Sequence, residues 1–401
     1  METISTTRWS ANLGQSLLSF LFDIGGLLTG ALAVYFGVFS IKEAPWALIL
    51  FPGILSVRGA IGGLFSSHLS TGLHLGTVRA NYTKNTTYFR LLLQAVISLA
   101  LISGIAIGIG TSIFGVFLWK ATILDLTKLL AIVIANMALS VMLISPITIA
   151  FSVLSFRRGL DPDVIVYPIT STVSDIINTA CYIFSLNIFF KFNPFGKYLI
   201  GILDLVFFSL VMYILIKNFR EEKFLKVVKE FLFTLVFVTI IVNLTGAFLD
   251  KISKIIVNGA KIFVIYPALI TTIGGVGSII GSTTTTKLAL GIIKPFFSSI
   301  RQNLNEIWGS WMASLLMFTL YSIISSFTSG MTTFSYLLKI ATQLLITNIL
   351  AVSAMVIISY TVAIYTYRRG WDPDNFVIPI ESSLADGITT ISLLLVLTVI
   401  A

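Results

Sequence analysis

Two aspartates recur at matching places in the sequence, each inside a polar stripe of an otherwise apolar segment. Hydroxyl and amide side chains surround each one at offsets of three, four and seven residues, which places them on one face of an α-helix. The stripes are Ser171, Thr172, Asp175, Asn178 and Thr179, and then Ser382, Ser383, Asp386, Thr389 and Thr390. Magnesium prefers such oxygen ligands and usually keeps several waters. The stripes therefore predict binding of a hard divalent cation.

The same seven-residue motif precedes both stripes. Arg-Arg-Gly-x-Asp-Pro-Asp occupies residues 157–163 and again 368–374, and both copies run without a gap to Asp175 and Asp386, with eleven of nineteen positions identical. A fainter, glycine-rich pair covers residues 52–76 and 267–291 in the same order. We conclude that the chain contains two copies of one repeat.

Each motif is most simply a tight turn between two helices. Its glycine ends one helix, aspartate caps the next, proline takes the first turn and the arginines anchor at the membrane interface. Asp163 and Asp374 are also candidates for attracting cations at the mouth of a pore. The sequence leaves both roles open for these two aspartates.

Composition predicts an integral membrane protein. Only 11% of the 401 residues are charged and 56% are apolar, with a mean hydropathy of +0.98. A soluble domain carries about 25% charged residues. The apolar runs reach the roughly 20 residues that a helix needs to cross a bilayer, and they lack the alternation of a β-barrel. We therefore predict an all-α, multi-pass protein in the lipid bilayer of the cell membrane.

Eleven spans are predicted, at residues 13–39, 46–75, 89–118, 129–156, 164–190, 198–216, 231–249, 262–293, 308–327, 337–367 and 376–400. With a cytoplasmic N-terminus, the inside segments hold 16 Lys and Arg and the outside segments 9. This imbalance favours a cytoplasmic N-terminus and a C-terminus outside.

The repeats predict three parts of the chain. Residues 1–196 form a first five-helix repeat, 197–229 a linker span with a charged cytoplasmic loop, and 230–401 a second five-helix repeat. The spare sixth span resets the orientation, so we expect parallel repeats about an axis along the membrane normal. Such a chain mimics a parallel dimer and is compatible with a monomer.

Asp175 and Asp386 are expected near the bilayer centre. A helix rises about 1.5 Å per residue, which puts Asp175 roughly 16 Å from the start of its span at Val164. A charged Asp at that depth costs about 2.5–3.5 kcal/mol, so it normally faces a partner or a watery cavity. The alternative is structural: each Asp caps a broken helix or pairs with Arg58, although Arg58 has no basic counterpart at Ile273.

Other residues point away from competing classes. The net charge of +9 lies in short connections, which suits membrane orientation rather than nucleic acid. The single cysteine, Cys181, excludes a disulfide framework. His68, Asp23 and Asp204 are interpreted as local packing or polar contacts. No enzyme activity and no bound cofactor are expected; magnesium would be the transported ion.

These residues resemble the membrane domain of MgtE-type magnesium transporters, and more closely their two-repeat solute-carrier branch. The resemblance rests on three segments: Asp161-Pro162-Asp163 with Pro168 and Asp175, Asp372-Pro373-Asp374 with Pro379 and Asp386, and Ser66 to Thr71 after Arg58-Gly59. It implies a divalent-cation pathway between the repeats, with Asp175 and Asp386 matching the family's pore aspartate. Ala60 and Gly275 stand where the family often has Asn, which puts a ligand there in doubt. The family's cytoplasmic sensor domains have no counterpart in the sequence, so we expect no gating by them.

Two other functions stay open at this stage. One is an intramembrane, magnesium-dependent enzyme acting on a lipid diphosphate, although the symmetric duplication argues against it. The other is a proton-coupled carrier of an organic solute, with the aspartates as proton relays. Turnover of an isoprenoid diphosphate, or uptake that ignores divalent cations, would favour these alternatives.

Overall fold

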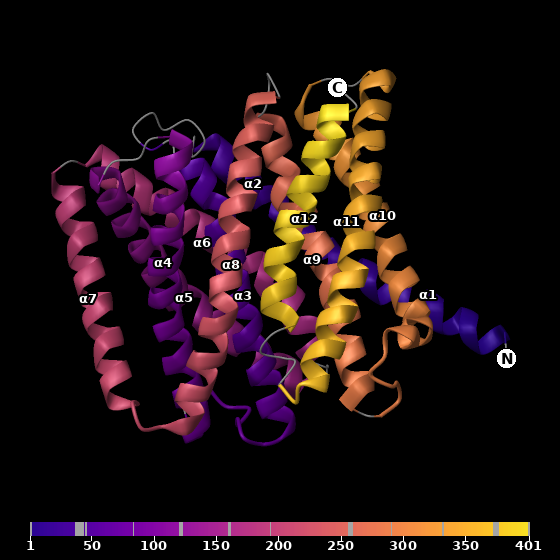
Figure 1. The fold of residues 1–401 in the computed structure, drawn as a ribbon, viewed down its shortest axis with the longest axis horizontal. Coiled ribbons are helices and arrows are strands. Elements are labelled where there is room, and N and C mark those ends of the chain that lie inside the picture. Colours follow the sequence, from indigo (N-terminus) through magenta and orange to yellow (C-terminus); the bar gives the residue numbers. More distant parts are fainter. Residues whose placement is uncertain are drawn as a thin grey trace. The chain divides into compact units, whose positions relative to one another are not determined.

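The computed structural model describes residues 2–36, 44, 46–82, 84–119, 123–158, 162–192, 194–255, 260–289, 291–330, 333–371 and 377–399. Every regular element in these ranges is helical (Figure 1). Eleven helical stretches are long and apolar enough to cross a membrane. The predicted all-α class and the predicted number of spans are therefore confirmed for the described chain.

One compact unit covers residues 35–246 and is called unit 2 below. Its helices are α3 (Trp46–His74), α4 (Thr87–Trp119), α5 (Ile123–Arg157), α6 (Pro162–Lys191), α7 (Phe195–Lys217) and the first part of α8 (Glu222–Ile255). Within the unit, α3 is the most buried span and α7 the least. Apolar side chains such as Leu199, Ile202 and Leu205 are exposed on α7, as expected for a helix that faces lipid.

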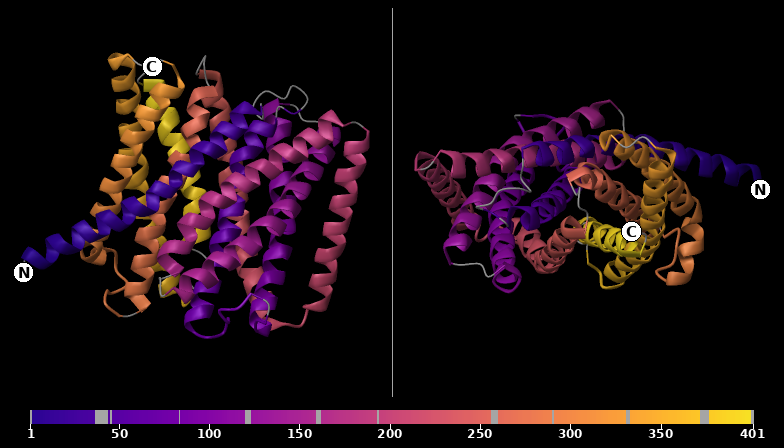
Figure 2. Two further views of the ribbon diagram at one scale, coloured as in Figure 1. Left: turned by 180° about the vertical axis from the view of Figure 1, so that it is seen from behind. Right: turned by 90° about the horizontal axis from the view of Figure 1, so that it is seen from above.

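The other compact unit, unit 1, joins residues 1–34 to residues 247–401. The N-terminal part comprises α1 (Glu2–Leu21), a 3₁₀ turn η1 (Phe22–Ile24) and α2 (Gly25–Tyr35). The C-terminal part comprises the end of α8, α9 (Ala260–Ala289), η3 (Phe297–Asn303), α10 (Leu304–Thr328), α11 (Phe334–Arg368) and α12 (Val377–Val399). In Figure 2 the N-terminal helix runs obliquely across α10, with which it packs. The first helix of the first repeat thus packs against helices of the second.

Glycines of α2 allow this helix to cross α9 at close range. A Cβ on Gly26 would lie 2.8 Å from the backbone nitrogen of Ala268, and one on Gly30 would run into the carbonyl oxygen of Val264. Small residues let two membrane helices approach until their backbones touch. Therefore α2 and α9 are held together by backbone contact.

Unit 2 contains the equivalent crossing, made by the first helix of the second repeat. A Cβ on Gly246 of α8 would run into the carbonyl oxygen of Ile49 at the start of α3. Ile49 and Val264 correspond in the register that aligns Pro52 with Pro267. Each repeat therefore places its first helix in the other repeat's unit. The two compact units are defined by which helices pack together, whereas the predicted domains are defined by the repeated sequence. The predicted boundaries at residues 196 and 229 therefore stay a prediction.

The charged stretch from Lys217 to Glu230 is more ordered than the predicted loop. The connection is short, because α7 ends at Lys217 and α8 begins at Glu222. Phe224, Val227 and Val228 are buried while the charged side chains between them are exposed or half-buried. Their spacing of three and four residues gives the start of α8 a buried apolar face. The many charged residues of this stretch, which lie on the opposite face, favoured a loop in the prediction.

Candidate functional site

The first polar stripe lies on α6 and mostly faces the interior of unit 2. Thr172, Asp175, Asn178 and Thr179 are buried, and Ser171 is half-buried. The residues predicted to share one face of the helix are therefore buried or half-buried together. This face is turned toward protein rather than lipid, as polar groups in a membrane span must be.

Asn178 ties three helices together. Its amide oxygen accepts hydrogen bonds from Asn136 Nδ2 at 3.0 Å and from Ser140 Oγ at 2.7 Å, both on α5. Its own Nδ2 donates to the backbone oxygen of Ile54 on α3 at 3.1 Å. An amide oxygen with two donors has little capacity left for a metal ion. In this arrangement Asn178 joins α6 to α5 and α3, and its role as a metal ligand stays a prediction.

Arg58 of α3 places a positive charge beside the first stripe. Its side chain is only 2% exposed, and none of its three guanidinium nitrogens has a hydrogen-bond partner among the described residues. The charges of Arg58 and Asp175 attract each other. Two buried side chains of opposite charge in unit 2 are what the structural alternative for Asp175, an electrostatic pair with Arg58, requires.

The second stripe lies on α12 and is equally buried. Ser383, Asp386, Thr389 and Thr390 are buried, and Ser382 is half-buried. Thr390 Oγ1 donates to the backbone oxygen of Asp386 at 2.5 Å and lies 2.7 Å from the hydroxyl of Tyr266. Tyr266 belongs to α9, and the charge of Asp386 acts on it. The second stripe therefore faces α9 across a tyrosine.

Glu381, the residue directly before the second stripe, was not predicted as a site residue from the sequence. It is 1% exposed and its two carboxylate oxygens make no hydrogen bond of ordinary geometry within the described chain. The hydroxyl of Ser359 on α11 is the group that interacts with it. The available signal was the alignment of the repeats, in which Glu381 takes the place of Thr170.

Asp23 supplies another buried acid in unit 1. It lies in η1, between α1 and α2, and its Oδ2 accepts a hydrogen bond from Thr272 Oγ1 at 3.0 Å. Thr272 in turn lies 3.0 Å from the hydroxyl of Tyr321. This agrees with the interpretation of Asp23 as a local polar contact.

The Asp-Pro-Asp motifs are only partly described. Asp163 lies in the first turn of α6, but its side chain is outside the described part of the structure, as is the whole of Asp374. The turn itself is visible at Gly370, whose φ of 69° is left-handed and whose neighbour Trp371 donates back to Thr366 O at 3.1 Å. A glycine that ends a helix in this way is the predicted arrangement.

The arginines of the motifs have structural partners. Arg157 Nε donates to the backbone oxygen of Ala80 at 2.9 Å, and its guanidinium stacks on the ring of Tyr82. Arg368 lies over the ring of Phe296 at 4.9 Å. These contacts support the interpretation of the motif arginines as anchors.

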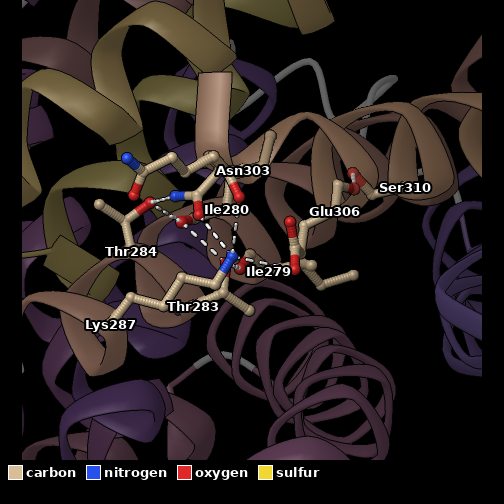
Figure 3. A network of polar contacts seen from close by, with 9 residues as sticks. Ile279, Ile280, Thr283, Thr284, Lys287, Asn303, Glu306 and Ser310 are labelled. Atoms are coloured by element: carbon tan, nitrogen blue, oxygen red, sulfur yellow. Dashed lines mark hydrogen bonds and ion pairs between the residues drawn. The ribbon is translucent and has the colours of Figure 1, made fainter. Parts of the chain in front are cut away.

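A polar network fixes the far end of α9 (Figure 3). Lys287 Nζ lies 2.6 Å from Asn303 Oδ1 and 3.0 Å from Glu306 Oε1, and Asn303 also donates to Thr284 at 2.8 Å. Because these groups join α9, η3 and α10, the network sets where α9 ends. The ammonium group of Lys287 already neutralises the carboxylate of Glu306, so the network stabilises the packing of these elements and is not a cation site.

The acids do not gather into one cluster. Within the described residues, no group of three or more His, Cys, Asp and Glu side chains is close enough to hold a metal ion. In unit 1 the acids lie near α9 at separate points instead: Asp23 accepts from Thr272, Glu381 lies beside Gly277, and Asp386 lies in the stripe whose Thr390 contacts Tyr266. A cation would therefore meet successive carboxylates along a helix, with hydroxyls and water completing its shell.

Comparison with known families decides the class of the protein. A family profile described as MgtE, divalent cation transporter, matches residues 51–185 and 266–396. The chain belongs to this family. The two matched segments begin next to Pro52 and Pro267, so they agree with the internal repeat. MgtE is a transporter family and not an enzyme family, and this MgtE-family chain is a multi-pass membrane protein.

Other comparisons add little. No curated protein matches the chain. A crystal structure of a eukaryotic MATE transporter aligns over 98% of this chain and 96% of its own, with 12% identity and a TM-score of 0.22. A similarity that low supports no conclusion about this MgtE-family protein.

Proposed function

We propose that this MgtE-family protein transports magnesium, with Asp386 and Asp175 as the acids that attract the ion. The observation that carries the proposal is the buried polar face of α12 around Asp386, in a chain of a divalent-cation transporter family. Every polar donor on that face is an oxygen, from carboxylate or hydroxyl. Such donors suit magnesium, whereas thiolate and imidazole select softer metals.

Depth also favours a role in permeation. Asp386 lies about ten residues into α12 from Val377, roughly 14 Å along the helix axis. A carboxylate kept at that depth needs compensation, which a passing cation would provide. Asp175 lies well inside α6, roughly 20 Å along its axis from Pro162, but it shares its surroundings with Arg58.

The test is magnesium uptake into proteoliposomes that contain the purified chain. We expect uptake by the unmodified protein, and loss of at least about tenfold in Asp386→Asn, because the substitution removes the charge that offsets dehydration of the ion. Asp204→Asn is the matched control, since Asp204 is a half-buried acid of the outer helix α7. Excess manganese or cobalt on the outside measures selectivity.

The opposite result is equally informative. If the unmodified, folded protein takes up no magnesium, or if Asp386→Asn transports as well as Asp204→Asn, the proposed function is wrong. Uptake of another divalent ion alone would correct the ion and leave the transport of a divalent cation standing.

A further inference from the structure

Buried charge is distributed unequally between the two units. Among the described residues, unit 2 buries one acid, Asp175, together with one base, Arg58. The described part of unit 1 buries the acids Asp23, Glu381 and Asp386 and no basic side chain. Positive charge from a bound cation would offset the charge of any of these acids that is ionised, in addition to contacts such as the hydrogen bond that Asp23 accepts from Thr272.

The position of Arg58 shows where that charge belongs. A Cβ placed on Gly62 of α3 would have Arg58 Nη1 as its nearest neighbour, at 3.8 Å. The guanidinium therefore occupies the space beside Gly62. Gly277 of α9 is the counterpart of Gly62 in the second repeat, and the counterpart of Arg58 is the neutral Ile273.

The corresponding place in unit 1 is bordered by Met355, Ser359 and Glu381. A Cβ on Gly277 would lie 3.2 Å from Ser359 Oγ and 3.9 Å from Glu381 Cβ, with Met355 Cε at 2.5 Å. Both Ser359 and Glu381 are buried, the two side chains interact with each other, and no other described residue is a hydrogen-bond partner of either side chain. A carboxylate and a hydroxyl thus converge beside the glycine, where α9, α11 and α12 meet.

We propose that Glu381 and Ser359 bind a hard divalent cation beside Gly277, in the place that the Arg58 guanidinium takes in unit 2. This position is distinct from Asp386. The two acids are five residues apart on α12, about 7.5 Å along its axis and on different sides of the helix. The proposed cation site rests on the proposed function in one respect only, namely that the bound ion is the transported ion.

The position would follow Asp386 along the route of the ion. Glu381 lies on the N-terminal side of Asp386, toward the Asp-Pro-Asp motif that precedes α12 in the sequence. An ion leaving Asp386 would meet a second carboxylate before reaching the turn. Several weak sites in series allow an ion to enter and still to leave, which one tight site does not.

The test is a count of bound ions on the purified chain in detergent, with Mn²⁺ as the probe and Mg²⁺ as competitor. We expect Glu381→Gln to bind one Mn²⁺ fewer per chain, or to bind that ion at least about tenfold more weakly, since affinity follows the number of charged ligands. Gly277→Ala keeps the carboxylate but adds a methyl group that collides with Met355 Cε and crowds Ser359 Oγ, so it should weaken binding of the same ion. Gly201→Ala and Asp204→Asn are the controls; a Cβ on Gly201 meets nothing.

One outcome overturns the proposal. Gln has the shape of a protonated Glu, so equal Mn²⁺ binding by Glu381→Gln and the unmodified protein means that Glu381 is a neutral packing group. If Glu381→Gln does not fold, unchanged binding by a folded Gly277→Ala rejects the site in the same way.

Uptake measured on the same preparations separates the two proposals. Loss of one Mn²⁺ in Glu381→Gln without magnesium uptake by the unmodified protein keeps this site and rejects the transport of magnesium. Magnesium uptake that depends on Asp386, together with unchanged Mn²⁺ binding in Glu381→Gln, keeps the proposed function and rejects the Glu381 site.

Discussion

Arg58 is the residue that most clearly distinguishes the two repeats. Its charge acts on Asp175, and both side chains are buried in unit 2. Arg58→Ile, which copies the residue of the second repeat, leaves Asp175 without its counter-charge and is expected to lower stability by about 3–5 kcal/mol. The double variant Arg58→Ile with Asp175→Asn should recover part of this loss, with an interaction energy of about 1–3 kcal/mol. Thermal unfolding in detergent measures the cycle, and strictly additive losses would show that the two groups do not interact.

Residue types and spacing predicted part of the site. The helical offsets around Asp175 and Asp386 were sufficient to place both stripes on buried faces, because the period of a helix is fixed by its backbone. The roles of Asn178 and Glu381 depend on what the preceding helices α5 and α11 bring beside them, and the period of α6 or α12 alone does not say which residues those are. No local pattern carries that information, so Asn178 was predicted to be a ligand and Glu381 was not.

At the scale of elements, the crossing of α2 and α9 depends on Gly30. A Cβ at this position would overlap the backbone of Val264, which cannot move without displacing the helix. Gly30→Ala is therefore expected to destabilise the protein by about 1–3 kcal/mol, as overpacking usually does. Gly246→Ala should have a similar effect at the equivalent crossing in unit 2.

A matched control separates overpacking from helix propensity. Gly201→Ala on α7 adds the same methyl group in open space, and alanine favours a helix by about 1 kcal/mol over glycine. It should leave the unfolding temperature unchanged or raise it. If Gly30→Ala is as stable as Gly201→Ala, the backbone contact between α2 and α9 does not hold the unit together.

The whole molecule was predicted well in its count of spans and poorly in its packing. Apolar runs and the returning Arg-Arg-Gly-x-Asp-Pro-Asp motif suffice to indicate eleven spans and two repeats, since both are properties of the sequence. Which helix packs in which unit depends on contacts such as Gly30 with Val264, between residues more than 200 positions apart. The cytoplasmic N-terminus and a monomeric state stay predictions.

The exchange of first helices makes a prediction about splitting the chain. A cut in the short connection between α7 and α8, after Phe219, separates the repeats but leaves each fragment with a first helix that packs in the other unit. Fragments 1–219 and 220–401 expressed alone should aggregate or be degraded, because each unit then lacks one of its helices and exposes the groove that the helix fills. Expressed together they should co-purify and elute as one species on size exclusion. A chain cleaved at the same place after folding is the control and should stay assembled. A fragment 220–401 that is monodisperse by itself would mean that unit 1 does not need α1 and α2, and the exchange would then be dispensable for folding.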